Sequence, residues 1–202
     1  IGEVLESIEH FIPPIAADAE EMAALLRSGT QGSVEKADGR SIAIIGAGPA
    51  GLSAAHDLAL MGFKPVVFEI EPVAAGMLAV GVPAYRLPRE LIAKEVAVIE
   101  ALGVEIRCGV QVGTDVSFAD LRKDHEAVII AVGAKGSRGI GLTGENGPGV
   151  IGGVDLLRAV SLGEKVDVGD EVVVIGGGNV AYDVARSVVR QIAFDTARTA
   201  AR

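Results

Sequence analysis

One local design, an apolar run followed at once by a glycine-rich turn and the start of a helix, occurs twice in this chain. The first copy spans residues 42–51 and the second spans residues 172–181, so the two are offset by 130 residues. Apolar strands that are continuous rather than alternating, and that are separated by helices, indicate a parallel sheet covered on both faces. The sequence therefore predicts an α/β fold, a Rossmann-like doubly wound parallel sheet, in a protein with two dinucleotide-binding domains.

The pattern of apolar runs, prolines and glycines divides the chain into three parts. Residues 1–38 are predicted to form a helical segment, interrupted at Pro13 and Pro14, and a linker; residues 39–150 form the first dinucleotide-binding domain, and residues 151–202 begin the second. We expect strands at residues 41–45, 66–68, 104–107, 128–132 and 172–175, helices at residues 49–61, 88–103, 156–162 and 179–202, and long loops at residues 71–85 and 136–153. The strand at 172–175 lacks neighbouring strands, so we expect it to pack on further segments or to be poorly ordered.

The first glycine turn has the context that dinucleotide binding requires. Gly46 permits the sharp turn, Gly48 lets the backbone approach a diphosphate without a Cβ in the way, and Gly51 lets the helix lie close to the strand. The helix N-terminus supplies N–H donors and a partial positive charge. Glu69 follows the last of these glycines by 18 residues and ends the next strand, where a carboxylate accepts hydrogen bonds from ribose and repels a 2′-phosphate. The first site therefore suits FAD or NAD rather than NADP; a glycine turn used only for packing is the alternative.

The loop after Glu69 is longer than NAD binding needs. It contains Gly76, Met77 and Leu78, and a glycine-containing loop of this length can wrap the flavin end of a larger cofactor. Arg86 follows, and three roles are open for it: an ion pair with a cofactor phosphate, one with a neighbouring carboxylate, or one at the surface.

The composition excludes several classes of protein. Half of the 202 residues are hydrophobic, which is too many for a disordered chain, and no apolar run reaches the ~18 residues of a membrane helix. A formal net charge of −9 and a pI near 4.8 argue against nucleic-acid binding. One cysteine excludes a disulfide framework and a cysteine-held iron–sulfur cluster in this chain, and three well-separated histidines indicate no metal site. We expect a soluble, cytoplasmic protein without a membrane span.

The two glycine turns and the loop after the first one resemble a known flavoprotein family, that of the glutamate synthase small subunit. The family includes the N-terminal flavin region of dihydropyrimidine dehydrogenase and the flavin subunits of NAD(P)H:ferredoxin oxidoreductases. The resemblance spans residues 41–190 and is carried by the runs GAGPAGLSAA from residue 46, GML from residue 76, GVP from residue 81, YRLP from residue 85 and GGGNVA from residue 176. The chain departs from the family at Ala75, where a glycine is usual, which adds a methyl group near the cofactor.

The resemblance implies where the cofactors bind. FAD would be lined by Gly46, Ala47, Gly48, Pro49, Ala50, Glu69, Gly76, Met77, Leu78 and Arg86, with Val112 meeting the adenine end through its backbone. The NAD(P) diphosphate would be held by Gly177, Gly178, Asn179 and Val180, and Gly51, Gly133, Gly176 and Ala181 complete the predicted cofactor-binding set. In the family the NAD(P) domain is inserted into the FAD domain. We therefore expect a fragment that stops within the NAD(P) domain and lacks an iron–sulfur region before residue 1.

The function implied by the resemblance is electron transfer. Hydride would pass between NAD(P)H and FAD, and single electrons between FAD and iron–sulfur clusters outside this chain, in a complex with a larger catalytic or iron–sulfur subunit. Hydride transfer needs no acid, base or nucleophile, so no catalytic residue is predicted. The alternatives are an NAD(P)-reducing flavin subunit of a ferredoxin-, aldehyde- or 2-oxoacid-linked oxidoreductase complex, and a cofactor-free structural module. The residue that selects NAD or NADP would follow the next strand, after residue 202.

Four further residues are assigned no chemical role. Cys108, at a predicted strand end, is expected to pack in the core, and His56 to be structural or solvated. Asp183 and Arg186 follow the second glycine turn, and we expect them to be surface charges of a helix rather than cofactor contacts.

Overall fold

The computed structural model describes residues 18–29, 37–169 and 171–200, with side chains described up to residue 193. The chain forms two compact units. The first consists of Ile1–Ala75 and Glu90–Val132, and the second of Gly76–Arg89 and Gly133–Arg202. The helix predicted before residue 18 with its break at Pro13 and Pro14, most of the predicted linker, and the last two residues of the final helix lie outside the described residues.

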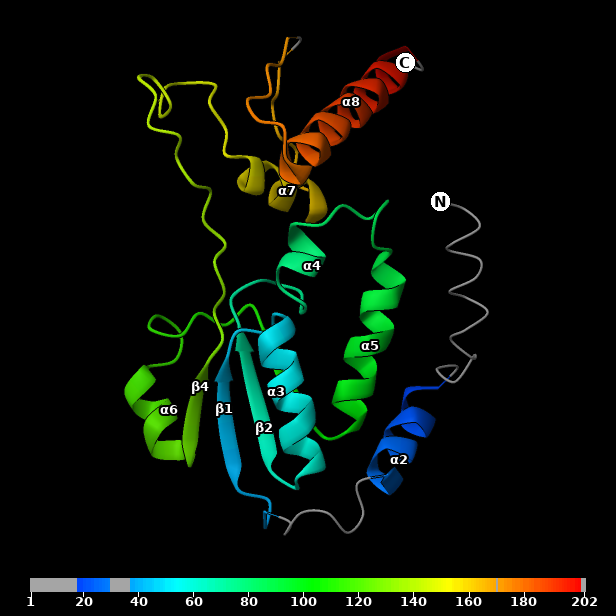
Figure 1. Ribbon diagram of the computed structural model, residues 1–202, viewed down its shortest axis with the longest axis vertical. Coiled ribbons are helices and arrows are strands. Elements are labelled where there is room, and N and C mark those ends of the chain that lie inside the picture. The colour runs from blue at the N-terminus through cyan, green and yellow to red at the C-terminus, as the bar shows by residue number, and fades with distance from the viewer. Residues whose placement is uncertain (1–17, 30–36, 170, 201–202) are drawn as a thin grey trace. The chain divides into compact units, whose positions relative to one another are not determined.

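A four-stranded parallel sheet forms the centre of the first unit (Figure 1). Its strands are β1 (Ser41–Ile45), β2 (Lys64–Glu69), β3 (Glu105–Cys108) and β4 (Ala127–Ile130), and they lie in the order β3-β2-β1-β4. Ile44 pairs with Val67 on one side and with Ile129 on the other, so the carboxyl ends of the strands meet at one edge. The strand order reverses between β1 and β4, and crevices at such reversals are where open α/β sheets bind ligands.

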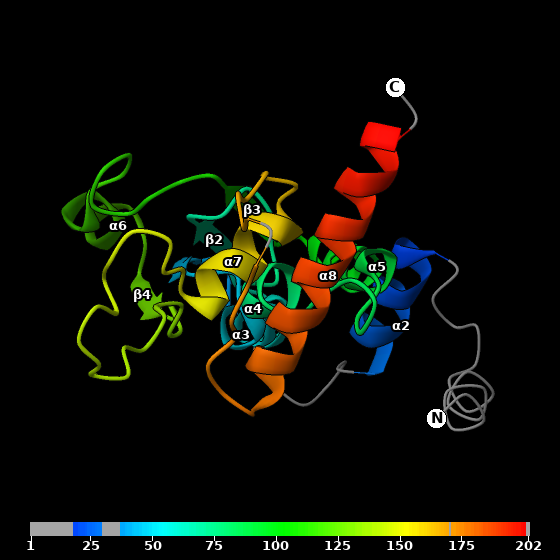
Figure 2. The same ribbon diagram turned by 90° about the horizontal axis from the view of Figure 1, so that it is seen from above.

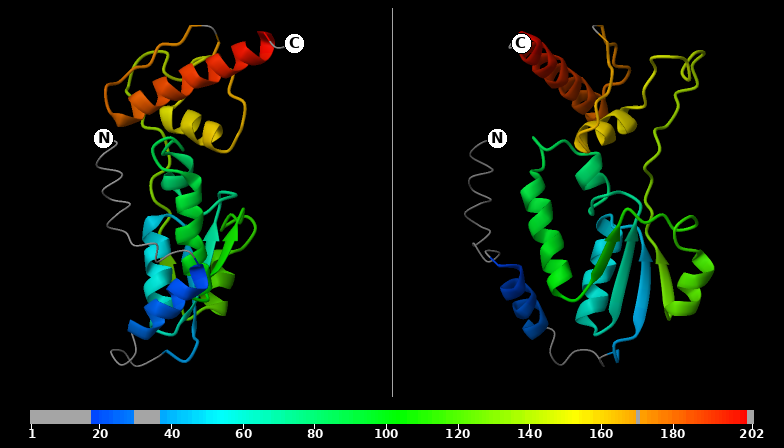
Figure 3. Two further views of the ribbon diagram at one scale, coloured as in Figure 1. Left: turned by 90° about the vertical axis from the view of Figure 1, so that its right-hand side faces the viewer. Right: turned by 180° about the vertical axis from the view of Figure 1, so that it is seen from behind.

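The helices of the first unit are α2 (Ala19–Gly29), α3 (Pro49–Leu60), α5 (Arg89–Ala101) and α6 (Phe118–Asp124). The first residue of α5, Arg89, belongs to the second unit. Pro49 suits the first position of α3 because its fixed φ is helical and this position needs no N–H acceptor, and α3 ends before Gly62, which has a φ of +87°. Right-handed crossovers place α3 and α5 on one side of the sheet, as Figure 3 shows. Arg27 joins α2 to the end of α5, since its Nη2 donates to Ala101 O at 2.5 Å.

Both faces of the sheet are covered. Ile44 and Val67 face α3, and a Cβ on Gly51 of that helix would lie 3.4 Å from Ile44 Cγ2. The alternate residues of the same strands, including Ala43 and Phe68, form a second cluster with Leu121 of α6. The predicted doubly wound parallel sheet is confirmed, because neighbouring residues of each strand bury side chains against different helices.

Ala75 has a positive φ of +78°, alone among the described non-glycine residues. It is 2% exposed, and its N–H donates to Ala47 O at 2.8 Å, which ties this loop to the first glycine turn. We expect Ala75→Val to destabilise the first unit by about 2 kcal/mol or more, because a β-branched side chain is disfavoured at positive φ and has no room here. Ala75→Gly should change stability by less than about 0.5 kcal/mol, since relief of backbone strain offsets the lost methyl contacts and the greater chain entropy of glycine. Denaturant unfolding compares the two variants, and equal losses would contradict this account.

The regular elements of the second unit are α4 (Met77–Val80), α7 (Gly153–Ser161) and α8 (Asn179–Ala200). Helices α7 and α8 lie side by side (Figure 2), and Leu156 and Leu157 of α7 pack against Val184 and Val188 of α8. Val174, in the extended segment before α8, is partly buried against this cluster. None of the helices in the described part of the chain is both long and apolar enough to cross a membrane.

Two predictions about this unit are wrong. Residues 172–175 are extended but form no strand, and Val173 and Ile175 are 87% and 72% exposed. Their β-branched side chains favour a strand, but a strand also needs a neighbouring chain to pair its backbone groups, and the described residues offer none here. The segment predicted as a loop at residues 71–85 contains the helical turn α4, which follows Gly76 and its φ of +52°.

Candidate dinucleotide-binding site

The first glycine turn joins β1 to α3 at the carboxyl edge of the sheet. Gly46 has a φ of +105° and donates its N–H to Phe68 O at 2.8 Å, and a Cβ there would lie 2.4 Å from Ala131 O. A Cβ on Gly51 would lie 1.9 Å from Gly46 O. Both obstacles are backbone atoms of the sheet edge and cannot move aside cheaply. The fold itself therefore requires glycine at these two positions.

Gly48 differs from its two neighbouring glycines because the fold does not require it. Its φ of −71° suits any residue, and a Cβ there would meet no atom within 4 Å. Gly48 is the N-cap of α3, and no side chain caps the helix at this position. The N–H groups of a first helical turn lack acceptors within the helix and carry partial positive charge. The turn therefore offers an open approach lined with donors, which fits the diphosphate of a dinucleotide.

Glu69 ends β2 and lies against the same turn. It is 1% exposed, and its two carboxylate oxygens accept backbone hydrogen bonds: Oε2 from Ala47 N–H at 2.7 Å and Oε1 from Glu71 N–H at 2.9 Å. These charge-assisted bonds compensate the cost of burying the carboxylate. Glu69 thus points toward the turn, as ribose binding there would demand; contact with a ribose stays a prediction.

The segment after β3 completes this edge of the sheet. Val110 donates its N–H to Glu69 O at 2.9 Å, which brings the segment beside the end of β2. Val112 follows, forms an isolated parallel bridge with Val116, and is partly buried against the cluster that contains Phe68. The first unit thereby brings together eight of the predicted cofactor residues: Gly46, Ala47, Gly48, Pro49, Ala50, Gly51, Glu69 and Val112.

The second glycine turn belongs to the second unit and leads into α8. Gly176 has a φ of +134°, and a Cβ on Gly177 or Gly178 would meet no atom within 4 Å. Asn179, Val180 and Ala181 form the first turn of α8. Residues 176–180 are all exposed, so this turn also presents a helix N-terminus that a ligand can approach.

The remaining predicted cofactor residues also lie in the second unit. Gly76 is the N-cap of α4, and Met77 and Leu78 form its first turn. Gly133 has a φ of +65° and is exposed just after β4. Arg86 lies in the strap, a name used here for residues 81–89. For all of these residues, cofactor contact stays a prediction.

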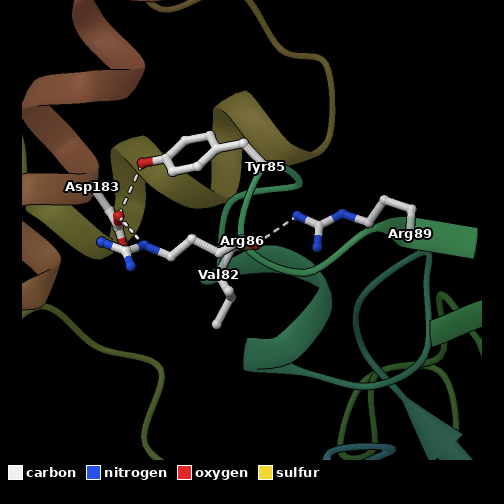
Figure 4. Close-up of polar contacts among 5 residues, drawn as sticks. All are labelled: Val82, Tyr85, Arg86, Arg89 and Asp183. Atoms are coloured by element: carbon white, nitrogen blue, oxygen red, sulfur yellow. Dashed lines mark hydrogen bonds and ion pairs between the residues drawn. The ribbon is translucent and has the colours of Figure 1, made fainter. Parts of the chain in front are cut away.

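A buried carboxylate on α8 organises the strap (Figure 4). Asp183 is 7% exposed, and its Oδ1 accepts hydrogen bonds from Arg86 Nε at 2.5 Å and from the Tyr85 hydroxyl at 2.9 Å. The hydrogen bond to Asp183 raises the pKa of Arg86 above its ordinary value, against an opposing effect of desolvation, so the guanidinium is charged. The prediction that Asp183 is a surface charge is wrong, because its side chain is buried against the strap. Arg186 is exposed, as expected.

Arg89 holds the strap from its other end. Its Nη2 donates to Val82 O at 2.7 Å and to Ser161 Oγ at 3.3 Å, and its Nη1 donates to Leu78 O at 3.0 Å (Figure 4 shows the bond to Val82). Burial lowers the pKa of Arg89 below its ordinary value, but a guanidinium remains charged in proteins. Sequence reasoning missed this residue; the available signal was a second arginine three residues after Arg86 in an otherwise apolar loop.

Glu145 anchors the glycine-rich loop of the second unit. Its Oε2 accepts the N–H groups of Gly141 and Ile140, each at 2.8 Å, and these bonds lower the pKa of Glu145 below its ordinary value of 4.5. A carboxyl whose pKa is lowered by folding stabilises the fold above its unfolded pKa, and this contribution is lost as the pH falls through the folded pKa. We expect the amide resonances of Ile140 and Gly141 to titrate together in NMR with a midpoint below 4.5. Glu145→Gln should remove this titration, and a midpoint above the ordinary value would refute the assignment.

Cys108 is exposed, so the prediction that it packs in the core is wrong. Desolvation, and then the carboxylates of Glu69 and Glu100, raise the pKa of the thiol, which is therefore protonated near neutral pH. His56 lies on α3 beside Asp57, with Nδ1 2.8 Å from Asp57 Oδ1.

The sequence and the fold of this chain are similar to those of known proteins. The pyridine nucleotide-disulphide oxidoreductase family matches residues 40–194. The chain is 48% identical over 168 residues to the NADP(+)-dependent formate dehydrogenase subunit beta of Moorella thermoacetica, in a match that covers 82% of this chain and 24% of that protein. It is 38% identical over 167 residues to the glutamate synthase (NADPH) small chain of Escherichia coli K12, covering 77% of this chain and 35% of that protein. The structure of Mycobacterium tuberculosis FprA in complex with NADPH matches with a TM-score of 0.62 and 31% identity, over 73% of this chain and 36% of that one.

A doubly wound sheet, a glycine turn at the end of β1 and a carboxylate at the end of β2 define the dinucleotide-binding class of α/β domains, and these relatives are pyridine nucleotide-linked oxidoreductases. The chain belongs to the pyridine nucleotide-disulphide oxidoreductase family, and the resemblance to the glutamate synthase small subunit is confirmed. The chain spans about a quarter of the length of the formate dehydrogenase subunit and about a third of the length of the glutamate synthase small chain. The disulphide in the family's name has no counterpart within these residues, which include one cysteine.

Proposed function

We propose that this chain is the FAD- and NAD(P)-binding part of an electron-transfer subunit. In this role it exchanges hydride with NAD(P)H and single electrons with iron–sulfur clusters outside the chain. One observation carries the proposal: at one edge of the sheet, the open approach at Gly48 lies beside a buried carboxylate, Glu69, that contacts the same turn. An acid at the end of β2 favours a free ribose 2′-hydroxyl, so the first turn would take FAD and the second turn NAD(P).

The chain's own residues act by binding and orientation. The N–H groups at the start of α3 and of α8 would hold the two diphosphates, and Glu69 would accept hydrogen bonds from ribose hydroxyls. Bound flavin supplies the redox chemistry, which is hydride exchange with the nicotinamide and release of single electrons. No side chain is assigned a proton transfer, because hydride transfer requires none.

The names of the relatives support a multi-subunit setting. One is a beta subunit of an NADP(+)-dependent formate dehydrogenase, and another is the small chain of an NADPH-linked glutamate synthase. We propose that the partner is a larger catalytic or iron–sulfur subunit. The identity to the formate dehydrogenase subunit, 48% against 38%, favours a dehydrogenase complex over a glutamate synthase.

The proposal is tested by the visible spectrum of the protein purified with its associated subunits. It should show the absorption of oxidised flavin, and anaerobic addition of NADH or NADPH should bleach that absorption. Titration with each nucleotide separately identifies the preferred one. A colourless protein that takes up no added FAD would overturn the proposal and favour a cofactor-free structural module.

A further inference from the structure

The strap is attached to α8 through one carboxylate oxygen. Asp183 Oδ1 accepts both the Nε–H of Arg86 and the hydroxyl of Tyr85, two consecutive residues of the strap (Figure 4). We propose that Asp183 is a positioning residue that orients Arg86 to bind a phosphate group of a dinucleotide. The inference rests on the proposed function and assigns a role to an acid that the sequence marks only as a helix charge.

Asp183 and the strap depend on each other. The Asp183 side chain is 10% exposed, and a buried carboxylate is costly unless charge-assisted hydrogen bonds compensate for lost water. The strap supplies both donors, one charged and one neutral. In return, the carboxylate fixes the side chain of Arg86, a residue that would otherwise lose much rotamer freedom on binding a ligand.

The contact leaves the outer end of the Arg86 guanidinium exposed. The Arg86 side chain is 40% exposed, and its hydrogen bond to Asp183 uses Nε and neither of the two terminal nitrogens. Guanidinium groups bind phosphate in a bidentate manner through such pairs of N–H groups. With Nε held by Asp183, the plane of the guanidinium is set in advance, and preorganisation of this kind raises affinity.

The surrounding charge favours an anion. The guanidinium of Arg190 lies 3.9 Å from the centroid of the Tyr85 ring, and among the described residues it pairs with no carboxylate. Asp183 therefore neutralises one of two guanidinium groups beside Tyr85. The positive end of α8 begins at Asn179, one turn before Asp183. FAD and NAD(P) both contain a diphosphate that this arrangement could bind, so the affinity for each must be measured separately.

The experiment measures the affinity of the protein for FAD, by titrating flavin-free protein, and for NAD⁺ and NADP⁺, which cannot reduce the flavin. Asp183→Asn should weaken binding of at least one of these dinucleotides about tenfold or more, and Arg86→Gln should weaken binding of the same one. The nucleotide affected identifies the source of the phosphate. Because Asp183 acts through Arg86, the double variant should bind no more weakly than Arg86→Gln alone.

Two further variants make the outcome decisive. Glu164→Gln removes the carboxylate of the exposed Arg158–Glu164 pair in the same unit and should leave every affinity unchanged. If Asp183→Asn does not fold, Arg86→Lys tests the phosphate contact, because it keeps the charge but lacks both Nε and the planar pair of terminal N–H groups and should lose the same affinity. Unchanged affinities in folded Asp183→Asn or in Arg86→Lys, or losses that add in the double variant, overturn the inference. Wild-type protein that binds no FAD overturns the proposed function instead.

Discussion

Gly48→Ala is expected to leave the first unit folded and to weaken FAD binding by about two orders of magnitude. A methyl group at this position meets no protein atom within 4 Å, and the φ of −71° suits alanine, so the fold should tolerate it. The same methyl would occupy the approach to the N–H groups of the first turn of α3. Loss of two charge-assisted hydrogen bonds to a diphosphate, at roughly 1.5 kcal/mol each, accounts for an effect of this size. Thermal unfolding of the flavin-free protein and titration with FAD measure the two quantities separately.

Gly51→Ala is the matched control, three residues away in the same turn. Its Cβ would lie 1.9 Å from Gly46 O, a backbone atom at the sheet edge, and we expect a loss of about 3 kcal/mol or more of folding free energy. The two glycines thus separate a requirement of binding from a requirement of folding. If Gly48→Ala destabilised the flavin-free protein as much as Gly51→Ala does, the turn would be a packing device and the proposed FAD site would lose its main support.

Glu69→Gln is expected to destabilise the flavin-free first unit by about 2 kcal/mol. The carboxylate is 1% exposed and accepts the N–H groups of Ala47 and Glu71 on separate oxygens. A carboxamide has one acceptor oxygen, so its NH₂ group must face one of these two N–H groups, and a hydrogen bond to a charged acceptor contributes about 1.5–3 kcal/mol. Denaturant unfolding gives the total loss, and hydrogen exchange at the Ala47 and Glu71 amides locates it.

Glu105→Gln provides the comparison for a carboxylate in the same sheet. Glu105 begins β3 and pairs with Arg107, but both side chains are about half exposed. Exposed ion pairs contribute between about 0 and 1 kcal/mol, so this variant should unfold nearly as the wild type does. Equal losses for the two variants would show that Glu69 does not hold the turn through its buried hydrogen bonds.

The part of the first unit that forms the first glycine turn could be predicted from the sequence because the signals that determine it are local, whereas helix α6 was not predicted. The apolar run at residues 41–45 is β1, with the predicted ends. Pro49 begins α3 and Gly62 follows its end. The spacing of Gly46, Gly48 and Gly51 indicated a tight turn, and the structure adds which of the three are sterically required. A clash with backbone atoms depends on where the neighbouring strand runs, and the spacing of the glycines does not reveal this.

The second unit was harder to predict because its interactions link distant parts of the chain. Asp183 and Arg86 are 97 residues apart, and in the sequence a buried acid near the start of a helix looks the same as a solvated one. The run at residues 172–175 has strand propensity, but pairing decides whether a strand forms. Arg89 is fixed by the backbone carbonyl groups of Leu78 and Val82. Every residue has such a group, so the sequence does not tell which carbonyl groups an arginine contacts.

The separation of Arg86 and Asp183 by 97 positions in the sequence also has a consequence during synthesis. Translation at roughly 5–20 residues per second separates their emergence by about 5–20 s. Throughout that interval the strap has been made but the acid that fixes it has not. The nascent chain must therefore carry Arg86 of the strap without its acidic partner until α8 has been made.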